Sequence, residues 1–209
     1  MPETALRQPL NVDPVQPLDT THPLLRGVQG FWLPLPHLSG GARLYDLSGR
    51  GRHGDILSDA GWRHDSRRGE YVYFEGAQSS ENRVTIPNAQ SVSPDGLTIM
   101  VVCRFRQIPD NQRQWIAQKY VGDPSPDEFW LEYRTDKIGS LRFVVNNGDF
   151  RSVRSTIDLT VGKWYTIIGS SENDGTTDLQ LYVNGVRPNI LKAANSPNTP
   201  VTNTAPLEL

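Results

Sequence analysis

The sequence has little cysteine and no long hydrophobic run, and each absence excludes a class of protein. One cysteine, Cys103, is present among 209 residues, so no disulfide can form within the chain. It stands in the apolar run LTIMVVCRF, a setting typical of a small buried hydrophobe rather than of a nucleophile. Nowhere do about eighteen apolar residues follow one another, and the N-terminus has no secretory leader pattern. We therefore expect no membrane insertion and synthesis as a soluble product in the cytoplasm.

An excess of positive charge and the usual metal spacings are also missing. Lys and Arg number 21 against 23 Asp and Glu, which gives a net charge of −2. Without a positive field we expect no nucleic-acid partner. The four histidines have no metal spacing, and a thiolate site would need a second cysteine. We predict no metal ligand and no cofactor, although calcium stays open because Asp46, Asp55 and Glu75 could offer oxygen atoms.

Proline is concentrated at the N-terminus. Residues 1–23 contain five prolines and only scattered apolar residues, which excludes a regular helix or a central strand. We predict an extended, proline-rich arm over these residues. Two interpretations stay open, namely a tail without fixed structure and an arm that becomes ordered along a neighbouring molecule.

From residue 24 to residue 209 the pattern changes to short β-type runs separated by turn residues. The run 97–105 is almost continuously apolar, which predicts a central strand covered on both faces. Residues 188–206 indicate a long loop before a last short strand at 206–209. Almost no helix is expected, so the domain is predicted to be all-β. The ten strands predicted before this last one, including that of the apolar run, cover residues 27–35, 71–76, 82–87, 97–106, 114–119, 128–134, 140–147, 151–159, 164–171 and 179–185.

A glycine-rich stretch, GRGRHG, matches the pattern G-x-G-x-x-G at Gly49, Gly51 and Gly54. A dinucleotide site needs a strand before this turn and a helix after it, whereas the following DILSDAGW is too short and too broken for a helix. We interpret the stretch as a structural turn. Asp46 and Ser48 would bind nearby backbone N–H groups, and the three glycines would adopt conformations closed to other residues.

Several stretches together resemble a known family. HPLLRGVQGFWLPL (22–35), YDLSGRGRHG (45–54), Trp62 and YVYFEG (71–76) resemble the start of laminin-G-like domains of the concanavalin A-like lectin/glucanase superfamily. VGKWYTIIGSSENDGTTDLQLYVNGV (161–186) is similar to their later strand pair. The resemblance implies a jelly-roll sandwich of two antiparallel sheets.

The end of the sequence departs from that family. Domains of this kind usually have a further strand after the one that begins near Pro206, whereas this sequence stops at Leu209. Either the sandwich 24–209 lacks its last strand, or a neighbouring chain completes the sheet. In both cases we expect an unfinished edge strand at the C-terminus.

The superfamily includes glycosidases, which need two carboxylates at a fixed separation. Their E-x-D-x-x-E type of motif is absent. Glu128 and Glu132 lie four residues apart on one predicted strand, and we interpret both as solvent-facing strand charges. No nucleophile elbow is present either. We predict no catalytic residue, and hence a protein that is not an enzyme.

Aromatic rings are the remaining candidates for ligand contact, because sugars stack on exposed rings. Trp115, Tyr120, Trp130 and Tyr133 flank the segment QKYVGDPSPDEFW and form the predicted ligand-binding set. Packing in the core is the alternative for these side chains, since aromatic residues commonly fill a sandwich.

Two functions follow from these observations. The first is a non-enzymatic structural protein of a virus particle, such as a phage capsid decoration. It would be assembled in the host cytoplasm and would bind other virion proteins or copies of itself through the arm. The second is a carbohydrate-binding module of a larger secreted or surface protein, with cell-surface glycans as extracellular partners. The arm, the unfinished edge and the missing leader favour the first, and the family resemblance favours the second.

Overall fold

The structure is a computed structural model. It describes residues 19, 21–22, 26–34, 42–57, 60–74, 82–87, 96–108, 113–119, 129–134, 140–146, 150–172, 179–193 and 207–209. Almost all of the predicted arm 1–23 lies outside these ranges, as do Glu75, Tyr120 and Glu128. Within them there is no helix of the length and apolarity needed to cross a membrane.

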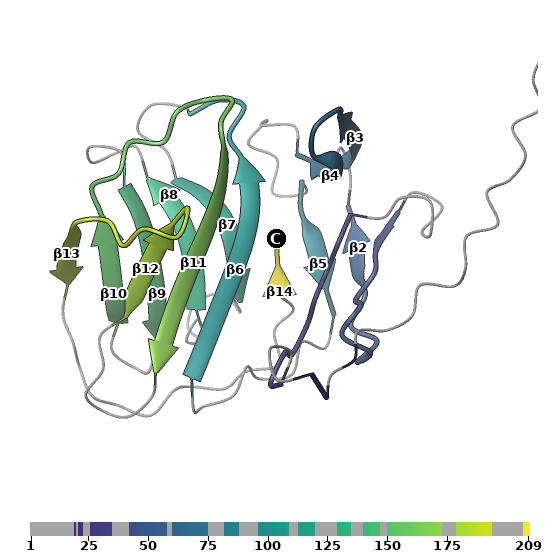
Figure 1. The fold of residues 1–209 in the computed structure, drawn as a ribbon, viewed down its shortest axis with the longest axis horizontal. Helices are drawn as coiled ribbons and strands as arrows, with labels where there is room; N and C mark the ends of the chain where they lie inside the picture. The colour runs from purple at the N-terminus through teal and green to yellow at the C-terminus, as the bar shows by residue number, and fades with distance from the viewer. Residues whose placement is uncertain are drawn as a thin grey trace, which may run out of the picture.

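The regular elements of the described residues are all β-strands (Figure 1). They are β1 (Arg43–Leu44), β2 (Gly54–Ile56), β3 (Gly61–Asp65), β4 (Gly69–Tyr73), β5 (Val84–Ile86), β6 (Gly96–Arg104), β7 (Arg113–Lys119), β8 (Phe129–Arg134), β9 (Ser140–Asn146), β10 (Phe150–Ser155), β11 (Trp164–Glu172), β12 (Gln180–Val183), β13 (Ile190–Ala193) and β14 (Leu207–Glu208).

The strands form two facing sheets and a separate hairpin. The large sheet has nine strands in the order β1-β2-β5-β14-β7-β8-β9-β10-β13, and the small sheet has three in the order β12-β11-β6. Within the part of the chain that the structure describes, strands β3 and β4 pair only with each other. Figure 1 shows the small sheet in front of the part of the large sheet that β8, β9 and β10 form. The predicted all-β, two-sheet antiparallel sandwich is therefore confirmed.

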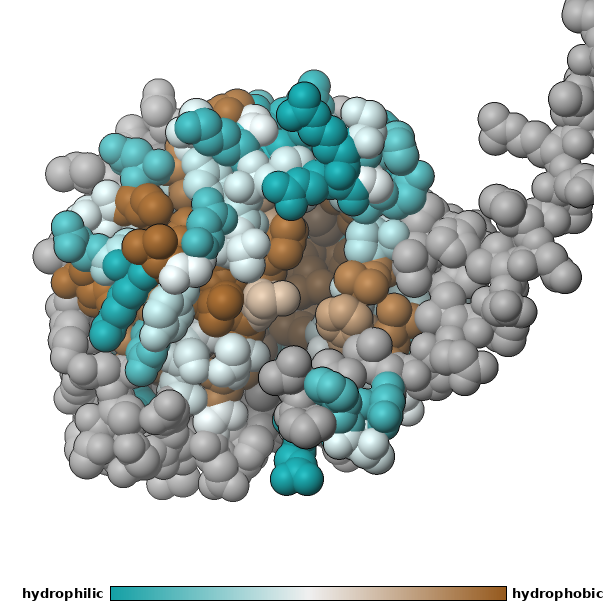
Figure 2. Space-filling model, viewed as in Figure 1, coloured by the Kyte–Doolittle hydropathy of each residue, from teal (hydrophilic) through white to brown (hydrophobic). Residues whose placement is uncertain are grey.

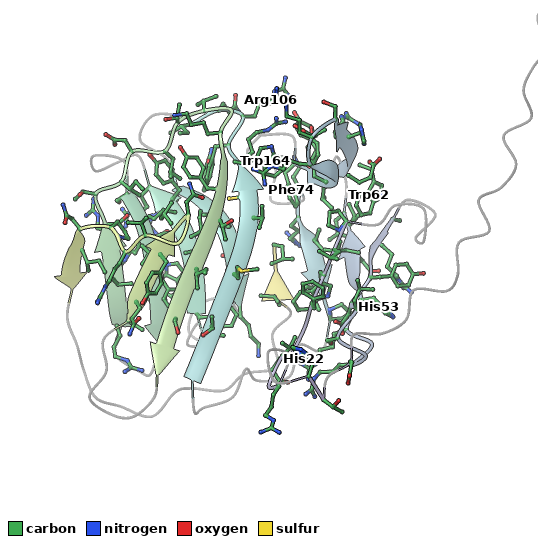
Figure 3. All side chains as sticks on the ribbon, viewed as in Figure 1. His22, His53, Trp62, Phe74, Arg106 and Trp164 are labelled. Carbon is green, nitrogen blue, oxygen red and sulfur yellow. The ribbon has the colours of Figure 1, made fainter. Side chains whose placement is uncertain are left out.

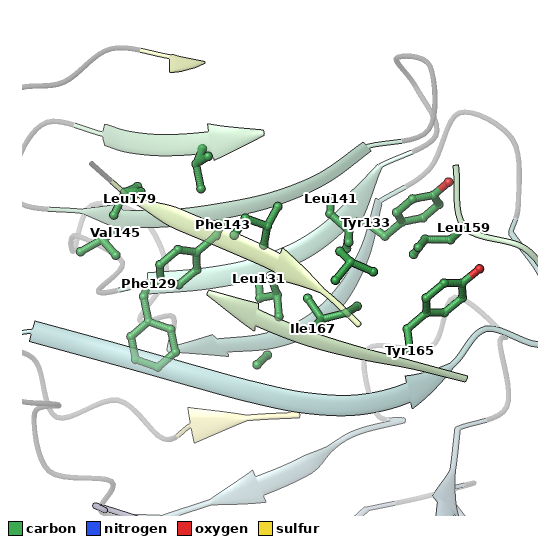
Figure 4. Packing of buried hydrophobic residues seen from close by; sticks show 14 of the residues in the cluster. Phe129, Leu131, Tyr133, Leu141, Phe143, Val145, Leu159, Tyr165, Ile167 and Leu179 are labelled. Carbon is green, nitrogen blue, oxygen red and sulfur yellow. The ribbon is translucent and has the colours of Figure 1, made fainter. Parts of the chain in front are cut away.

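The core lies between the two sheets, because alternate side chains of each strand point to the facing sheet (Figure 4). From β8 the core receives Phe129, Leu131 and Tyr133, and from β11 it receives Ile167. Apolar area removed from water on both inner faces is the main source of stability in such a sandwich.

The two sheets lie close together at Gly169, where there is no side chain between them. A Cβ atom on Gly169 of β11 would lie 2.7 Å from the ring of Phe143 on β9, which is itself fully buried. Substituting alanine for Gly169 is expected to lower the free energy of unfolding by roughly 1–3 kcal/mol, because the packed ring has no room to move. Urea denaturation measures this loss.

Gly61 of β3 provides the matched control. A Cβ atom there would have no neighbour within 4 Å. Gly61→Ala is expected to change the free energy of unfolding by no more than about 0.5 kcal/mol. Equal losses in the two variants would show that the close approach at Gly169 is not what the substitution disturbs.

Three predictions about individual strands are wrong. Residues 27–34 of the predicted strand 27–35 do not form a strand, since Trp32 makes only an isolated bridge to Asp46. Strand β6 is not covered on both faces, because Met100 and Val102 on its outer side are 61% and 52% exposed. Residues 190–193, within the predicted loop 188–206, form β13 against β10.

The expected open edge at the C-terminus is also wrong. Strand β14 lies inside the large sheet, with β5 on one side and β7 on the other. Beyond it, Leu209 and Val84 exchange two backbone N–H···O=C bonds of 2.9 Å each. Because the last residues are paired on both sides, they offer no free edge to a partner strand.

Candidate functional site

The side of the large sheet that points away from the small sheet carries a group of large polar and aromatic side chains. Because side chains alternate along a strand, these side chains lie on the face of the sheet that points away from the core residues. The direct pairing of β7, β8, β9 and β10 brings them side by side on that face. We call this surface the arginine face; it is formed by Arg113, Trp115, Trp130, Glu132, Arg134, Arg142 and Arg154.

Glu132 is at the centre of the arginine face and has no exposed surface. Its Oε1 lies 3.5 Å from Nη1 of Arg142 and 3.9 Å from Nη1 of Arg134. The prediction of a solvent-facing charge is therefore wrong. The physical reason is position within the sheet, since Glu132 lies directly between Trp115 on β7 and Arg142 on β9, two of the largest side chains.

The guanidinium group of Arg142 is held from two sides. Besides Glu132, it contacts Ser152 on β10, to whose Oγ the Nη2 donates a hydrogen bond of 3.4 Å. Burial lowers the pKa of Arg142, while the charge of Glu132 raises it. The positive charges of Arg134 and Arg113 act in the same direction as burial and lower it further.

Trp115 and Trp130 form an edge-to-face pair beside this charged group. Their ring centroids are 6.2 Å apart with an interplanar angle of 76°. Trp115 is 46% exposed, whereas Trp130 is 8% exposed and supports it from within the sheet. The structure thus brings together two of the predicted ligand residues and leaves one of them accessible.

A β-bulge explains why Trp115 points outward. The pairing of β7 with β8 shifts between Trp115 and Ala117, so that Trp115 lies opposite Glu132 while Ala117 lies opposite Leu131. Residues two apart normally share a face, but the extra residue here reverses the alternation. Ala117 remains in the core and Trp115 is re-aimed to the arginine face.

Tyr133 does not belong to this site, and its prediction as a ligand residue is wrong. It is 2% exposed and packs in the core (Figure 4). Its ring centroid lies 5.4 Å from that of Phe105. Burial raises the pKa of its hydroxyl group. The alternation of β8 already assigns Tyr133 to the side of Phe129 and Leu131, opposite Trp130.

The glycine-rich turn is stabilised by the carboxylate of Asp46. Its Oδ1 accepts hydrogen bonds from the backbone N–H groups of Ser48 (2.9 Å) and Phe31 (3.1 Å), and Oδ2 accepts one from Arg52 (3.0 Å). Burial acts to raise the pKa of Asp46, but the hydrogen bonds, those of Ser48 foremost, outweigh it and hold the pKa below its usual value. A carboxylate engaged in this way serves the turn.

The three glycines of the turn have two different roles. Gly49 and Gly51 have φ angles of 80° and 69°, which favour glycine. Gly54 does not have a positive φ, so the prediction that it supplies conformational freedom is wrong. It begins β2 where a Cβ atom would lie 2.5 Å from Cγ1 of Val84 and is needed for close packing.

A cation site needs several oxygen, nitrogen or sulfur ligands close together. The described residues contain no group of three or more His, Cys, Asp or Glu side chains that could hold a metal ion. Of the residues that could offer oxygen atoms to calcium, Asp46 accepts hydrogen bonds within the turn. Asp55 forms an ion pair with Arg43 at 3.5 Å.

A second polar cluster joins the β3–β4 hairpin to the small sheet (Figure 3). The guanidinium group of Arg104 lies over the rings of Trp164 and Tyr71, 5.2 and 5.5 Å from their centroids. Its Nη1 is 3.3 Å from Oδ2 of Asp65. Figure 2 shows a hollow lined by hydrophobic residues beneath this part of the surface. The contacts of Arg104 are satisfied within the chain, so the cluster serves to fix the hairpin.

Comparison with known protein families identifies the superfamily to which the fold belongs. A family model described as the concanavalin A-like lectin/glucanases superfamily matches residues 78–209, which is well over half of the chain. The chain belongs to this superfamily. The resemblance of its sequence to laminin-G-like domains is thereby confirmed, and so is the sandwich that the resemblance implies. No curated protein matches the chain.

Members of the concanavalin A-like superfamily are typically non-catalytic binding modules, although some are glycosidases. Their fold is compatible with the binding of glycans or of proteins. The specific activity of this member has to be argued from its own residues, because one fold supports many functions.

Proposed function

We propose that the protein is a non-enzymatic carbohydrate-binding module and that sugar binds on the arginine face. The observation that carries this proposal is the half-exposed ring of Trp115, supported edge-on by the buried ring of Trp130. A sugar ring has an apolar C–H surface that packs on such a platform, and its hydroxyl groups accept hydrogen bonds from neighbouring guanidinium groups. Arg113 and Arg142 lie on the same face to donate them.

The surroundings of Glu132 support binding rather than hydrolysis. A glycosidase uses two carboxyl groups on either side of the bond it cleaves. The ion-pair partners of Glu132 among the described residues, Arg134 and Arg142, are both arginines. The side chain of Glu132 is fully buried beneath the surface that a sugar would contact. Glu132 therefore serves to hold the arginines.

Assembly into a virus particle stays a prediction. It is based on the missing leader pattern, on the lack of catalytic groups, on the arm 1–23, which lies almost wholly outside the described residues, and on an open C-terminal edge, which the pairing of β14 contradicts. The carbohydrate-binding proposal rests instead on side chains that the structure places together.

The test is a glycan array followed by titration calorimetry on the best ligand, with Trp115→Ala as the variant. Loss of the stacking surface is expected to weaken binding at least about tenfold, as for an aromatic residue at the centre of a binding site. Phe74→Ala is the matched control, since Phe74 is another aromatic residue with 39% exposure and belongs to a different surface. Circular dichroism of both variants serves to check that they are folded.

The outcomes separate clearly. Weaker binding by Trp115→Ala together with unchanged binding by Phe74→Ala supports the proposed site. Unchanged binding by Trp115→Ala would place the sugar elsewhere on the molecule. A folded wild-type protein that binds no glycan on the array would overturn the carbohydrate-binding function itself.

A further inference from the structure

Strand β6 has one edge that no other strand covers in the part of the chain that the structure describes. It lies at the end of the small sheet and pairs along its whole length with β11 on its other side. A long edge with an unpaired row of backbone N–H and C=O groups is a template for one more strand.

The backbone groups of β6 that point away from β11 can be identified. The carbonyl of Thr166 on β11 accepts a hydrogen bond of 2.8 Å from the backbone N–H of Asn184, on the side of β12. Because successive residues point their N–H and C=O groups to alternate sides, the two neighbours of Thr166 point to β6, and their partners Cys103 and Val101 point back to β11. The residues of β6 whose groups point to the open edge are therefore Thr98, Met100 and Val102.

The side chains of β6 are incompletely covered on both faces. On the outer face, Met100 and Val102 are 61% and 52% exposed. On the inner face, Ile99, Val101 and Cys103 pack against the core but are only partly buried. Figure 2 shows the hollow lined by hydrophobic residues beside this edge. A strand added here would cover apolar surface as well as pair the backbone.

The N-terminal arm is attached at the end of the molecule where β6 begins. Residues 1–18, which lie outside the described residues, precede a turn in which the backbone N–H of His22 donates a hydrogen bond of 3.0 Å to the carbonyl of Asp19. Such a turn reverses the direction of the chain. Figure 3 shows His22 just below the hollow, and Figure 1 shows that β6 runs away from that end. An arm that leads to this turn along β6 would run antiparallel to it.

Residues 10–16, LNVDPVQ, have the alternation of a strand with one apolar side. Leu10, Val12 and Pro14 fall on one side of such a strand. The other side carries, in order, Asn11, Asp13 and Val15. The first side suits the hydrophobic hollow, and the second, with two polar residues, suits solvent.

The prolines of the arm determine which of its backbone groups can pair. Proline has no N–H group and is accepted within an edge strand where that group would face solvent. Pro14 fits if the even-numbered residues turn their N–H groups away from β6. Pro9 and Pro17 are odd-numbered, so each would lack the N–H that pairing then needs and would end the strand. The stretch that can pair is residues 10–16, which is shorter than β6.

We propose that residues 10–16 of the chain's own arm form an edge strand antiparallel to β6 and extend the small sheet. A strand centred on β6 places Asn11, Asp13 and Val15 opposite Val102, Met100 and Thr98, the residues with free backbone groups. Pro14 then lies opposite Ile99, whose N–H and C=O groups point to β11. Two independent facts agree in this register, because the apolar side of the arm also falls on the inner face of β6. The strand is separate from the proposed sugar site, which lies on the large sheet.

The arm of a second copy of the chain could make the same hydrogen bonds. The chain's own arm is favoured because the turn at Asp19 and His22 directs the preceding residues back toward the molecule to which they belong. An exchanged strand would instead join two copies into a dimer.

The pairing is tested by hydrogen–deuterium exchange of the full chain, followed by NMR at the amides of Thr98, Met100 and Val102. These amides are expected to exchange slowly in the wild type, as those of a paired strand do. Asn11→Pro removes an N–H that pairs, and it is expected to accelerate their exchange at least about tenfold. Gln16→Pro is the matched control with exchange as in the wild type, since the N–H of an even-numbered residue would face solvent.

Oxidation shows which chain supplies the strand. The proposed register places Leu10 opposite Cys103, the single cysteine of the chain, in a pair whose Cα atoms would be about 4.5 Å apart, within reach of a disulfide. Leu10→Cys is expected to form a disulfide within one chain. The oxidising buffer has to be alkaline, because burial raises the pKa of the Cys103 thiol to about 12. Asn11→Cys is the control, since its side chain would lie on the opposite face and form no link.

Slow exchange that is lost in Asn11→Pro and kept in Gln16→Pro, together with a disulfide inside one chain, supports the proposal. Fast exchange of the three amides in the wild type would mean an open edge and would overturn it. Equal exchange in the two proline variants would mean that another segment covers β6, with the same consequence. A disulfide between two chains would assign the strand to a second copy, and no disulfide from Leu10→Cys would overturn the register.

Discussion

Removal of residues 207–209 is expected to abolish cooperative folding. These residues form β14 and its continuation, which lie between β5 and β7 in the large sheet. Without them β1, β2 and β5 lose their backbone connection to the rest of that sheet. Leu207 also belongs to the hydrophobic core, at 9% exposure. A chain end in this position contributes to the fold as an interior strand does.

The size of the effect follows from what the three residues contribute. Loss of a buried leucine side chain costs about 2–5 kcal/mol, and each lost backbone hydrogen bond about 1 kcal/mol more. The sum is comparable to the whole stability of an ordinary domain, about 5–15 kcal/mol. We therefore expect the truncated chain to show no cooperative urea transition and no near-ultraviolet circular dichroism spectrum of a packed core.

Leu207→Ala separates the contribution of the leucine side chain to stability from that of the strand pairing. This variant keeps the backbone pairing with Ile86 and Lys119, so it is expected to unfold cooperatively with a loss of about 2–4 kcal/mol. If the truncated chain unfolded at the same urea concentration as the wild type, β14 would not be the element that joins the two parts of the large sheet.

Most of the long strands could be predicted from the sequence. The segments predicted at 114–119, 140–147 and 164–171 agree with β7, β9 and β11 to within one residue at each end. In these segments β-branched and aromatic residues are frequent, and the signal is local. The two-residue strand β1 and the three-residue strand β2 carry no such pattern, because they depend on pairing with distant partners.

The candidate site was only partly predictable for the same reason. The two tryptophans could be proposed from residue type, but the arginines could not, because Arg113, Arg142 and Arg154 come from three different strands and meet only through the register of the sheet. The outward direction of Trp115 depends on a β-bulge, and no residue type within β7 predicts that bulge. Sequence alternation alone would have placed Trp115 and Ala117 on one face.

Replacement of Glu132 by glutamine is expected to lower the free energy of unfolding by roughly 3 kcal/mol. The substitution keeps the shape of the side chain but removes the negative charge next to Arg142 and Arg134. Removal of one partner of a buried ion pair leaves the other charge without compensation in a poorly solvated place, which typically costs about 3–5 kcal/mol. The value expected here is at the lower end, because 24% of the Arg142 side chain reaches solvent. Urea denaturation measures it.

The ion pair between Arg43 and Asp55 is a control with the same N···O distance as that of Glu132 and Arg142 but different burial. Its atoms are also 3.5 Å apart, but both side chains are about half exposed, at 50% and 51%. Asp55→Asn is therefore expected to cost less than about 1 kcal/mol, and less still in high salt. If Glu132→Gln proved as mild as Asp55→Asn, water would have to reach the arginines of the arginine face. In that case water would already solvate their charges, and Glu132 would not be needed to hold them in place.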